Sequence, residues 1–503
     1  AACNEETLDP GDDPIVTPGP DDPNDPGKPE EPTPPEEEPE ATEGLVFELL
    51  TTENSDGFEE VLGEDFEDCY MCTGLTVAEE NVVIPSTYNG LPVRMVRWHD
   101  LEPEISNRIV SIYIPDSIQF VDFAYDYYNN SDYENLTEIR LPRNPNAMIL
   151  GSSYFSGCAF YNDPSNWEDG ALYMDDWLLA TNGDLPEEYT VKQGTFGIAM
   201  GAFLYQDNED YKSHVKKVTV PDGVQALVGS FTQCDSLEEV VLPDSLSSIG
   251  YNAFLLCNSL TSITIPDSVT SIGGGAFLSC SSLTSVTIPD GVTAIGGGAF
   301  EWCESLTSIV IPDSVTSIGE GAFSGCCSLT SIVIPDSVTS IGSSAFSGCS
   351  SLTSITIGDG VTYIDNRAFS SCYSLTSIVI PDSVTSIGES AFSSCYSLTS
   401  ITIPDSVTTI GDWAFYGCES LASVTIGDGV TSIGDSAFSS CGGLTSITIP
   451  DSVTSIGDWA FSGCDSLTTV YYTGSETEWK EIEIKEWNDA LMYATIIFNY
   501  TGE

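Results

Sequence analysis

Cysteine is the first residue type of this chain whose spacing could do chemistry. Eleven cysteines follow one another at steps of 23 residues from Cys234 to Cys464, and Cys327 adds a twelfth beside Cys326. A file of thiols could bind metal or form disulfides, but metal sites need clustered ligands with a defined geometry. Each of the eleven stands three residues after a phenylalanine, and unpaired cysteine buries readily as a small apolar side chain. The pattern therefore favours buried structural thiols.

Aspartate repeats at the same step, with one residue per unit. Carboxylates about 5 Å apart repel one another unless solvent, hydrogen bonds or cations compensate. Calcium prefers such oxygens but takes six to eight of them. Two interpretations stay open, a turn-forming role screened by bulk salt and a calcium ladder that would include Asp267, Asp290, Asp313 and Asp336. The whole row comprises Asp244, Asp267, Asp290, Asp313, Asp336, Asp359, Asp382, Asp405, Asp428 and Asp451.

A catalytic constellation is not apparent in the sequence. His99 and His214 are the only histidines, which leaves little for a Ser-His-Asp or Cys-His device. A glycosidase needs two carboxylates in a shaped cleft, and a regular array offers a smooth surface. Cys69 and Cys72 form a lone C-x-x-C without a second ligand pair, so a local disulfide or plain thiols compete with redox or zinc chemistry. We expect no enzyme, and no cofactor apart from calcium in the second interpretation.

A 23-residue unit must position these side chains. Its example from Leu260 to Ser282 reads LTSITIPDSVTSIGGGAFLSCSS. The L-x-x-I-x-I part predicts a strand with alternate residues inward, and Pro266 ends it because proline cannot donate to a ladder. We expect a short helical turn from Gly274 to Cys280, and the stacked equivalents of Phe277 should form an aromatic spine. A fixed period of this length predicts a solenoid whose units stack only on their neighbours.

The unit resembles the BspA-like leucine-rich repeat, also called the Treponema pallidum type. The signature L-x-x-I-x-I-P-x-x-V-x-x-I-G-x-x-A-F-x-x-C extends over about residues 82–470. Asp365 replaces the glycine of one unit, and Gly358 and Gly427 replace the proline of two. The resemblance implies a repeat solenoid, a right-handed leucine-rich-repeat superhelix with one parallel β-sheet and short helical turns, capped at both ends.

Composition divides the chain into five expected segments. Residues 1–44 hold eleven prolines and fifteen acids against Lys28, which predicts a disordered, extended acidic tether. Atypical terminal units should seal the apolar ends of a solenoid. The other four segments are an N-terminal cap at 45–106, degenerate repeats with insertions at 107–214, regular repeats at 215–466 and a C-terminal cap at 467–503.

Charge and the first residues limit the partners. The formal net charge of −64 argues against nucleic acid and an anionic bilayer as partners, because both would repel the chain. Ala1 and Ala2 before Cys3 resemble the end of a bacterial lipobox, and acids follow the cysteine as in surface-export signals of some lipoproteins. This resemblance implies lipidation of Cys3. We therefore expect an outer-membrane-anchored lipoprotein on the extracellular face of a bacterial cell, in contact with the membrane only through its lipid.

The positions that vary between units surround the turn after the conserved glycine, and large aromatic residues occupy several of them. Exposed aromatic residues are enriched in interfaces, although incidental packing between neighbouring turns is the alternative. The family resemblance implies adhesion to host matrix or plasma proteins or to other bacteria. A structural spacer or surface-layer component, and a glycan-binding protein that uses the insertion at Tyr125 to Tyr133 or exposed tryptophans, are the alternatives. The candidate surface comprises Trp302, Tyr373, Tyr396, Trp413, Tyr416 and Trp459.

Overall fold

The computed structural model describes residues 40–51, 66–98, 101–123, 133–151, 155–207 and 210–502. All of the described residues belong to one compact unit, Glu40–Glu503. Most of the expected tether, Cys3 and residues 125–132 of the expected insertion lie outside the described residues. No helix among the described residues combines the length and apolarity needed to cross a bilayer.

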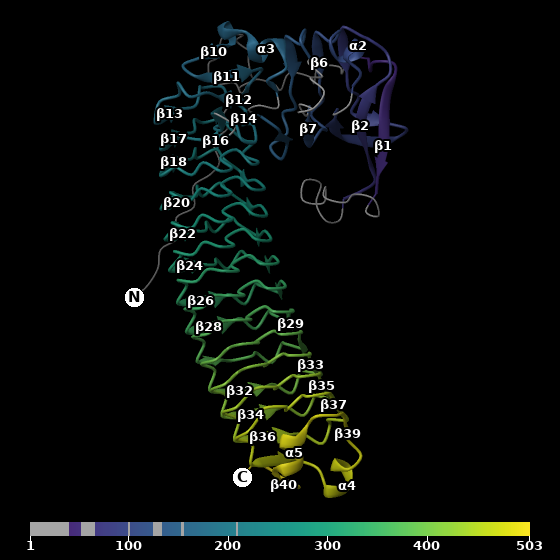
Figure 1. The fold of residues 1–503 in the computed structure, drawn as a ribbon, viewed down its shortest axis with the longest axis vertical. Helices are drawn as coiled ribbons and strands as arrows, with labels where there is room; N and C mark the ends of the chain where they lie inside the picture. Colours follow the sequence, from purple (N-terminus) through teal and green to yellow (C-terminus); the bar gives the residue numbers. More distant parts are fainter. Residues whose placement is uncertain are drawn as a thin grey trace, which may run out of the picture. The chain divides into compact units, whose positions relative to one another are not determined.

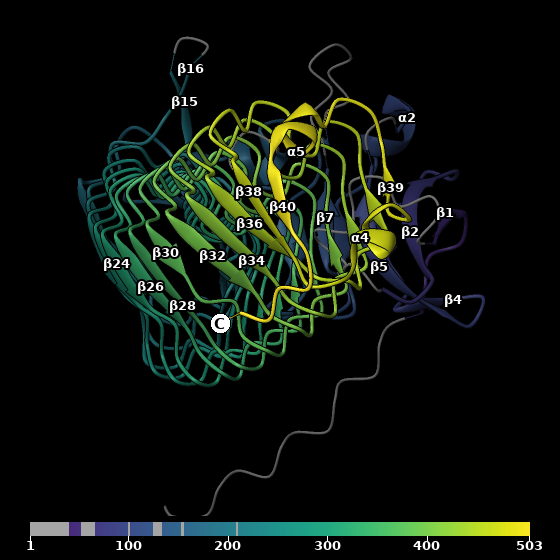
Figure 2. The ribbon, with the colours of Figure 1, turned by 90° about the horizontal axis from the view of Figure 1, so that it is seen from below.

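The strand expected at the head of each unit forms parallel pairs along one side of the stacked coils, in four successive sheets of three, three, three and five strands (Figure 1). Ser262 pairs with Ser285 and Ile263 with Val286, so each residue pairs with its equivalent one unit later. The repeat length therefore sets the register. Seen from below, the last members lie side by side (Figure 2). The strands are β13 (Glu188–Thr190), β17 (Lys217–Thr219), β18 (Glu239–Val241), β20 (Ser262–Thr264), β22 (Ser285–Thr287), β24 (Ser308–Val310), β26 (Ser331–Ile334), β28 (Ser354–Ile357), β30 (Ser377–Ile378), β32 (Ser400–Ile403), β34 (Ser423–Ile426), β36 (Ser446–Ile449), β38 (Thr469–Tyr472) and β40 (Thr495–Ile497).

A second parallel sheet, of eleven short strands, comes in addition to the one sheet expected. It arises because the chain becomes extended again at V-x-x-I after the Pro-Asp-Ser turn, where Thr270 N donates to Ser247 O at 2.9 Å. Its members are β19 (Ser248–Ile249), β21 (Ser271–Ile272), β23 (Ala294–Ile295), β25 (Ser317–Ile318), β27 (Ser340–Ile341), β29 (Tyr363–Ile364), β31 (Ser386–Ile387), β33 (Thr409–Ile410), β35 (Ser432–Ile433), β37 (Ser455–Ile456) and β39 (Glu483–Ile484).

The third side of each coil consists of turns, and the helical turn expected from Gly274 to Cys280 is absent from this described segment. Gly275 N donates to Gly297 O and Phe277 N to Ala299 O in the next coil, both at 2.8 Å. These N–H groups are therefore unavailable for a helical i→i−4 ladder. Left-handed backbone at Gly275, with φ of +60°, directs alternate N–H groups out of the coil.

The core lies between these three sides. The conserved leucine, isoleucine, valine, alanine, phenylalanine and cysteine of each regular unit are buried. The phenylalanine rings stack from Phe203 to Phe461 with centroids 5.0 to 5.5 Å apart, which confirms the expected aromatic spine. Each coil therefore buries its apolar surface against the coils before and after it.

The cap and degenerate repeats before the regular array follow the same plan with more irregular coils. β1 (Leu45–Leu50) runs antiparallel to β2 (Cys69–Leu75), and β2 then begins a parallel series that continues through β5, β7 and β9. A second series, β3, β6 and β8, corresponds to the strand side of later coils. The remaining bounds are β3 (Asn81–Val83), β4 (Thr87–Tyr88), β5 (Leu91–Arg97), α2 (Pro103–Ser106), β6 (Ser111–Tyr113), β7 (Phe120–Asp122), β8 (Glu138–Arg140), β9 (Met148–Ile149), α3 (Ala159–Asn162), η2 (Pro164–Asn166), β10 (Trp167–Glu168), β11 (Ala171–Met174), β12 (Trp177–Thr181), β14 (Gly197–Ile198), β15 (Tyr205–Asp207) and β16 (Asp210–Lys212), with α4 (Glu476–Trp479) and α5 (Asp489–Tyr493) near the C-terminal end.

Candidate recognition surface

Three of the six predicted aromatic residues stand where the backbone is left-handed. Trp302, Trp413 and Trp459 have φ of 57°, 54° and 54°. The position of Trp413 is left-handed in the other units too, where it holds glycine, as at Gly275 with φ of 60°, or a smaller or polar residue, as at Ser390 with φ of 55°. Left-handed backbone costs a bulky residue of order 1–3 kcal/mol, whereas glycine adopts it freely. Each indole is about half exposed, so the core does not require it.

The structure brings only some of the six together. Tyr373 and Tyr396 stack with ring centroids 5.0 Å apart and planes at 5°. The unit of Trp302 precedes that of Tyr373 by three steps of 23 residues, from Leu283 to Leu352. All six belong to the turn side and are exposed, so we call them the turn edge.

Packing between neighbouring turns contributes to some of these positions. A Cβ added at Gly325 would lie 2.7 Å from a ring carbon of Trp302, so this indole covers the next turn. Trp302 is nevertheless 49% exposed. The ring therefore combines partial packing with a free face, which is the arrangement of an interface aromatic residue.

Sequence reasoning missed three exposed apolar residues of the C-terminal segment. Trp479 packs edge-on against Tyr472 at 5.0 Å, as sealing residues do. Trp487 is instead 59% exposed, and Met492 and Tyr493 also lie open to solvent. The sequence assigns all of these apolar residues to the cap as one group. Only solvent exposure and ring contacts in the structure separate the exposed residues from the sealing ones.

The outer face of the strand side carries rows of serine and threonine side chains that valine interrupts. A hollow of about 1150 Å³ extends over Val379, Thr402 and Thr425 and is bordered by Asp382 and Asp405. Val379 is 79% exposed because it stands at an outward position of its strand, where Thr402 stands in the next unit. The face is thus an uncharged floor beside a row of carboxylates.

The aspartate row shows hydrogen bonds typical of a turn. Asp336 Oδ1 accepts from Asp359 N at 3.0 Å, and Asp405 Oδ1 accepts from Asp428 N at 2.9 Å. Within the described ranges, no three His, Cys, Asp or Glu side chains gather as they would to hold a metal ion. The calcium ladder from Asp267 stays a prediction.

The cysteine file forms a column of hydrogen bonds. Cys280 Sγ donates to Phe254 O at 3.1 Å, and Cys303 Sγ donates to Phe277 O at 3.2 Å. Burial raises the pKa of the Cys349 thiol to about 12. Because the thiolate is the reactive form, these buried thiols are chemically inert at neutral pH.

The lone C-x-x-C does not bring its cysteines into one site. Cys69 and Cys72 are buried free thiols that belong to two different apolar clusters. Burial raises the pKa of Cys72 to about 11. A redox pair depends on a lowered thiol pKa, so the arrangement favours plain structural thiols.

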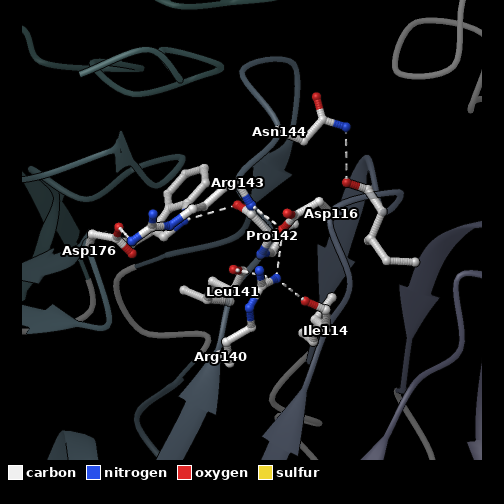
Figure 3. A network of polar contacts seen from close by, with 10 residues as sticks. Ile114, Asp116, Arg140, Leu141, Pro142, Arg143, Asn144 and Asp176 are labelled. Atoms are coloured by element: carbon white, nitrogen blue, oxygen red, sulfur yellow. Dashed lines mark hydrogen bonds and ion pairs between the residues drawn. The ribbon is translucent and has the colours of Figure 1, made fainter. Parts of the chain in front are cut away.

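Positive charge in the degenerate repeats is used to join neighbouring coils (Figure 3). Arg140 Nη1 lies 2.6 Å from Asp116 Oδ1, and Arg143 pairs with Asp176. Burial opposes ionisation of Asp116, but hydrogen bonds from Arg140 and from Arg143 N outweigh it and lower the pKa of this carboxyl. These two guanidinium groups therefore form ion pairs within the fold.

The chain matches a family model and several solved structures. Residues 207–326, 317–412 and 385–486 match the model described as the BspA type leucine rich repeat region, with 6 copies. No curated protein matches.

Among solved structures, a leucine-rich repeat protein from Bacteroides ovatus is 24% identical with a TM-score of 0.50, over 91% of this chain and 99% of that one. A leucine rich cell surface protein from Faecalibacterium prausnitzii is 27% identical with a TM-score of 0.35, over 88% and 97%. A leucine rich repeat protein of T. pallidum is 32% identical with a TM-score of 0.31, over 41% and 83%.

Proposed function

The chain belongs to the BspA-type leucine-rich repeat family, and we propose that it is a bacterial cell-surface protein whose turn edge binds other proteins. One observation carries the proposal: Trp302, Trp413 and Trp459 place half-exposed indoles at left-handed positions that other units fill with glycine or with smaller or polar residues, most often serine. Strained residues that persist without a core role point to function. Tryptophan is enriched among the few interface residues that carry most of the binding energy.

The partner classes follow from charge and from the family. A chain of net charge −64 repels polyanions and attracts basic patches on proteins. We propose host matrix or plasma proteins, or proteins of other bacteria, as the partners. The function needs no catalytic group and no cofactor.

The surface location is part of the same proposal. We infer that Cys3 carries a lipid and that the acidic, proline-rich segment after it keeps the repeats away from the membrane. Mass spectrometry of the N-terminal peptide from the native host tests this inference. A peptide that contains an unmodified Cys3 would remove the anchor.

A binding panel with matched variants tests the turn edge. Trp302→Gly and Trp413→Gly restore the residue that other units carry, so both variants should fold as well as the parent. Immobilised matrix and plasma proteins should bind the parent saturably and bind the double variant at least about tenfold more weakly. Ser390→Gly changes the same position as Trp413 without removing a ring, and its binding should be unchanged.

A structural spacer is the second candidate, and the columns of side-chain bonds between coils favour it. Ser268 Oγ donates to Leu246 O at 2.6 Å, and Thr284 Oγ1 donates to Thr261 O at 3.1 Å. Such columns stiffen the stack without requiring a ligand. Absence of binding across the protein panel would favour the spacer, whereas binding confined to a glycan array would favour carbohydrate recognition.

A further inference from the structure

We propose that a hollow beside α5 binds a weakly hydrated organic cation, such as a quaternary ammonium group. The hollow measures about 340 Å³ and lies between the last regular coil and α5. Trp459, Trp487 and Tyr493 line it together with Asp465 and Asp489. Its volume is at the small end of the range for ligand sites, which suits one compact group.

A buried asparagine anchors the segment that lines this hollow. Asn488 is 3% exposed, accepts from Phe461 N at 3.0 Å and donates to Gly457 O at 2.9 Å. In earlier coils the backbone of the next coil supplies such partners, as Ala460 O does for Phe438 N. The amide of Asn488 therefore substitutes for a further coil. It fixes the adjacent Trp487 beside Trp459.

The two indoles form an open pair. Their ring centroids are 6.4 Å apart and their planes are tilted by 36°. A cation that lies over the solvent-exposed face of one of these indoles, within about 6 Å of its centroid, is in the range of cation–π attraction. Tyr493, which is 86% exposed, adds a third aromatic side chain to the same hollow. Several aromatic rings around one small hollow are typical of quaternary ammonium recognition.

The backbone holds both indoles at a cost. Trp459 has φ of 54° and Trp487 has φ of 65°. The core does not require either residue, because both side chains are about half exposed to solvent. The rings are thus presented outward by a backbone that glycine would adopt more easily.

Charge selects a cation over other ligands. Of the described residues that line the hollow, Asp465 and Asp489 are acidic and none is basic. Lys485 is close in sequence but pairs with Asp435 at 3.5 Å. A cation gains from these carboxylates and from the net charge of −64, whereas an anion is repelled. A neutral sugar gains no attraction from the two carboxylates or from the net charge.

Indole N–H signals in a nitrogen-15 correlation spectrum of the full chain test the proposal, because each of the 8 tryptophans gives one signal. Choline chloride should shift the signals of Trp459 and Trp487 saturably. Trp413 is the internal control, since it has the same place in its unit and the same φ as Trp459 but precedes it by two units. Its signal should not move.

Matched probes and variants separate a cation site from a merely apolar one. Dimethylbutanol, the uncharged carbon isostere of choline, should bind at least about fivefold more weakly. Tyr493→Ala and Asp489→Asn change exposed side chains, so both variants should fold, and each should weaken choline binding several-fold. Sodium chloride at equal ionic strength should leave the signals in place.

Each other result has a defined reading. Equal shifts with dimethylbutanol, shifts with neutral oligosaccharides alone, or no shift at saturating choline would overturn the proposal. If choline binds, vesicles of phosphatidylcholine distinguish its source. If the protein binds the vesicles, the site recognises a lipid headgroup. If the protein binds choline but not the vesicles, the site recognises a soluble ammonium ligand.

Discussion

The Sγ atom of Cys349 lies 3.2 Å from the carbonyl oxygen of Phe323, one unit earlier in the stack. The same bond recurs from Cys257 to Cys464 at 3.0 to 3.3 Å. A residue type that could do redox or metal chemistry is therefore used as a donor between coils. Each of these cysteines follows a phenylalanine of the aromatic spine by three residues.

Removing one such thiol should destabilise the protein. Cys349→Ala leaves the Phe323 carbonyl without this donor and opens a small cavity, and we expect a loss of about 1–3 kcal/mol in the free energy of unfolding. Urea denaturation followed by circular dichroism measures the loss. Cys327→Ala is the control, because Cys327 is only partly buried and its Sγ contact to Gly348 O is long at 3.7 Å. Equal losses in the two variants would contradict a role for the column.

Stability should fall in alkali because of the same thiols. Burial raises the pKa of Cys234, Cys349 and Cys395 from 9.0 to about 12, so the folded state holds these protons more tightly than the unfolded state. The contribution of these thiols to the free energy of unfolding is complete below pH 9 and is lost as the pH rises from 9 towards 12. Each thiol contributes a slope of about 1.4 kcal/mol per pH unit in that window.

Melting temperatures between pH 7 and pH 11 check this alkaline prediction. The melting temperature of the parent should stay constant up to about pH 9 and fall steeply at higher pH. A double variant, Cys349→Ala with Cys395→Ala, should melt lower at pH 7 but decline less steeply above pH 9. Parallel curves for the two proteins would show that other groups cause the alkaline loss.

The aromatic spine should tolerate little truncation. The ring of Phe346 stacks between those of Phe323 and Phe369, with centroids 5.2 and 5.5 Å away. Phe346→Ala should cost about 3–5 kcal/mol, and Phe346→Leu clearly less because most of the volume stays filled. Tyr373→Ala disrupts an exposed stack and should cost under about 1 kcal/mol. Chemical denaturation measures all three, and a large loss for Tyr373→Ala would mean that the turn edge is structural.

Salt should stabilise the protein, and calcium tests the aspartate row. Raising the ionic strength screens repulsion within a chain of net charge −64, so calorimetry should show a higher melting temperature in sodium chloride. If the carboxylates act only as turn residues, calcium at equal ionic strength should add nothing further. A calcium-specific gain that disappears in Asp290→Asn with Asp313→Asn would establish the calcium ladder.

The regular coils could be predicted from the sequence because one spacing fixes every neighbour. The inward positions of Leu260, Ile263 and Phe277 follow from local periodicity, and the step of 23 residues then sets the register of the ladder. The second sheet and the turn side could not be predicted in the same way. Their strands are two residues long or absent, and the bonds of Thr270 and Gly275 run to other coils.

The candidate site could be predicted only in part. Variation between units identified Trp413 and Trp459, but their left-handed backbone and the stack of Tyr373 on Tyr396 need coordinates. Trp487 carries no sequence signal that separates it from a sealing residue such as Trp479. Its exposure, and the hydrogen bonds of the neighbouring Asn488 amide to the last coil, become visible only in the coordinates.

The bonds between coils also determine how the protein would respond to tension. They join each coil to the next, so a pull along the stack loads the rows one after another and does not shear them together. A detached coil releases 23 residues, about 80 Å of chain at full extension, in exchange for a rise of about 4.8 Å. A stack of this kind, held at its two ends, would lengthen in equal steps and dissipate force while the remaining coils stay folded.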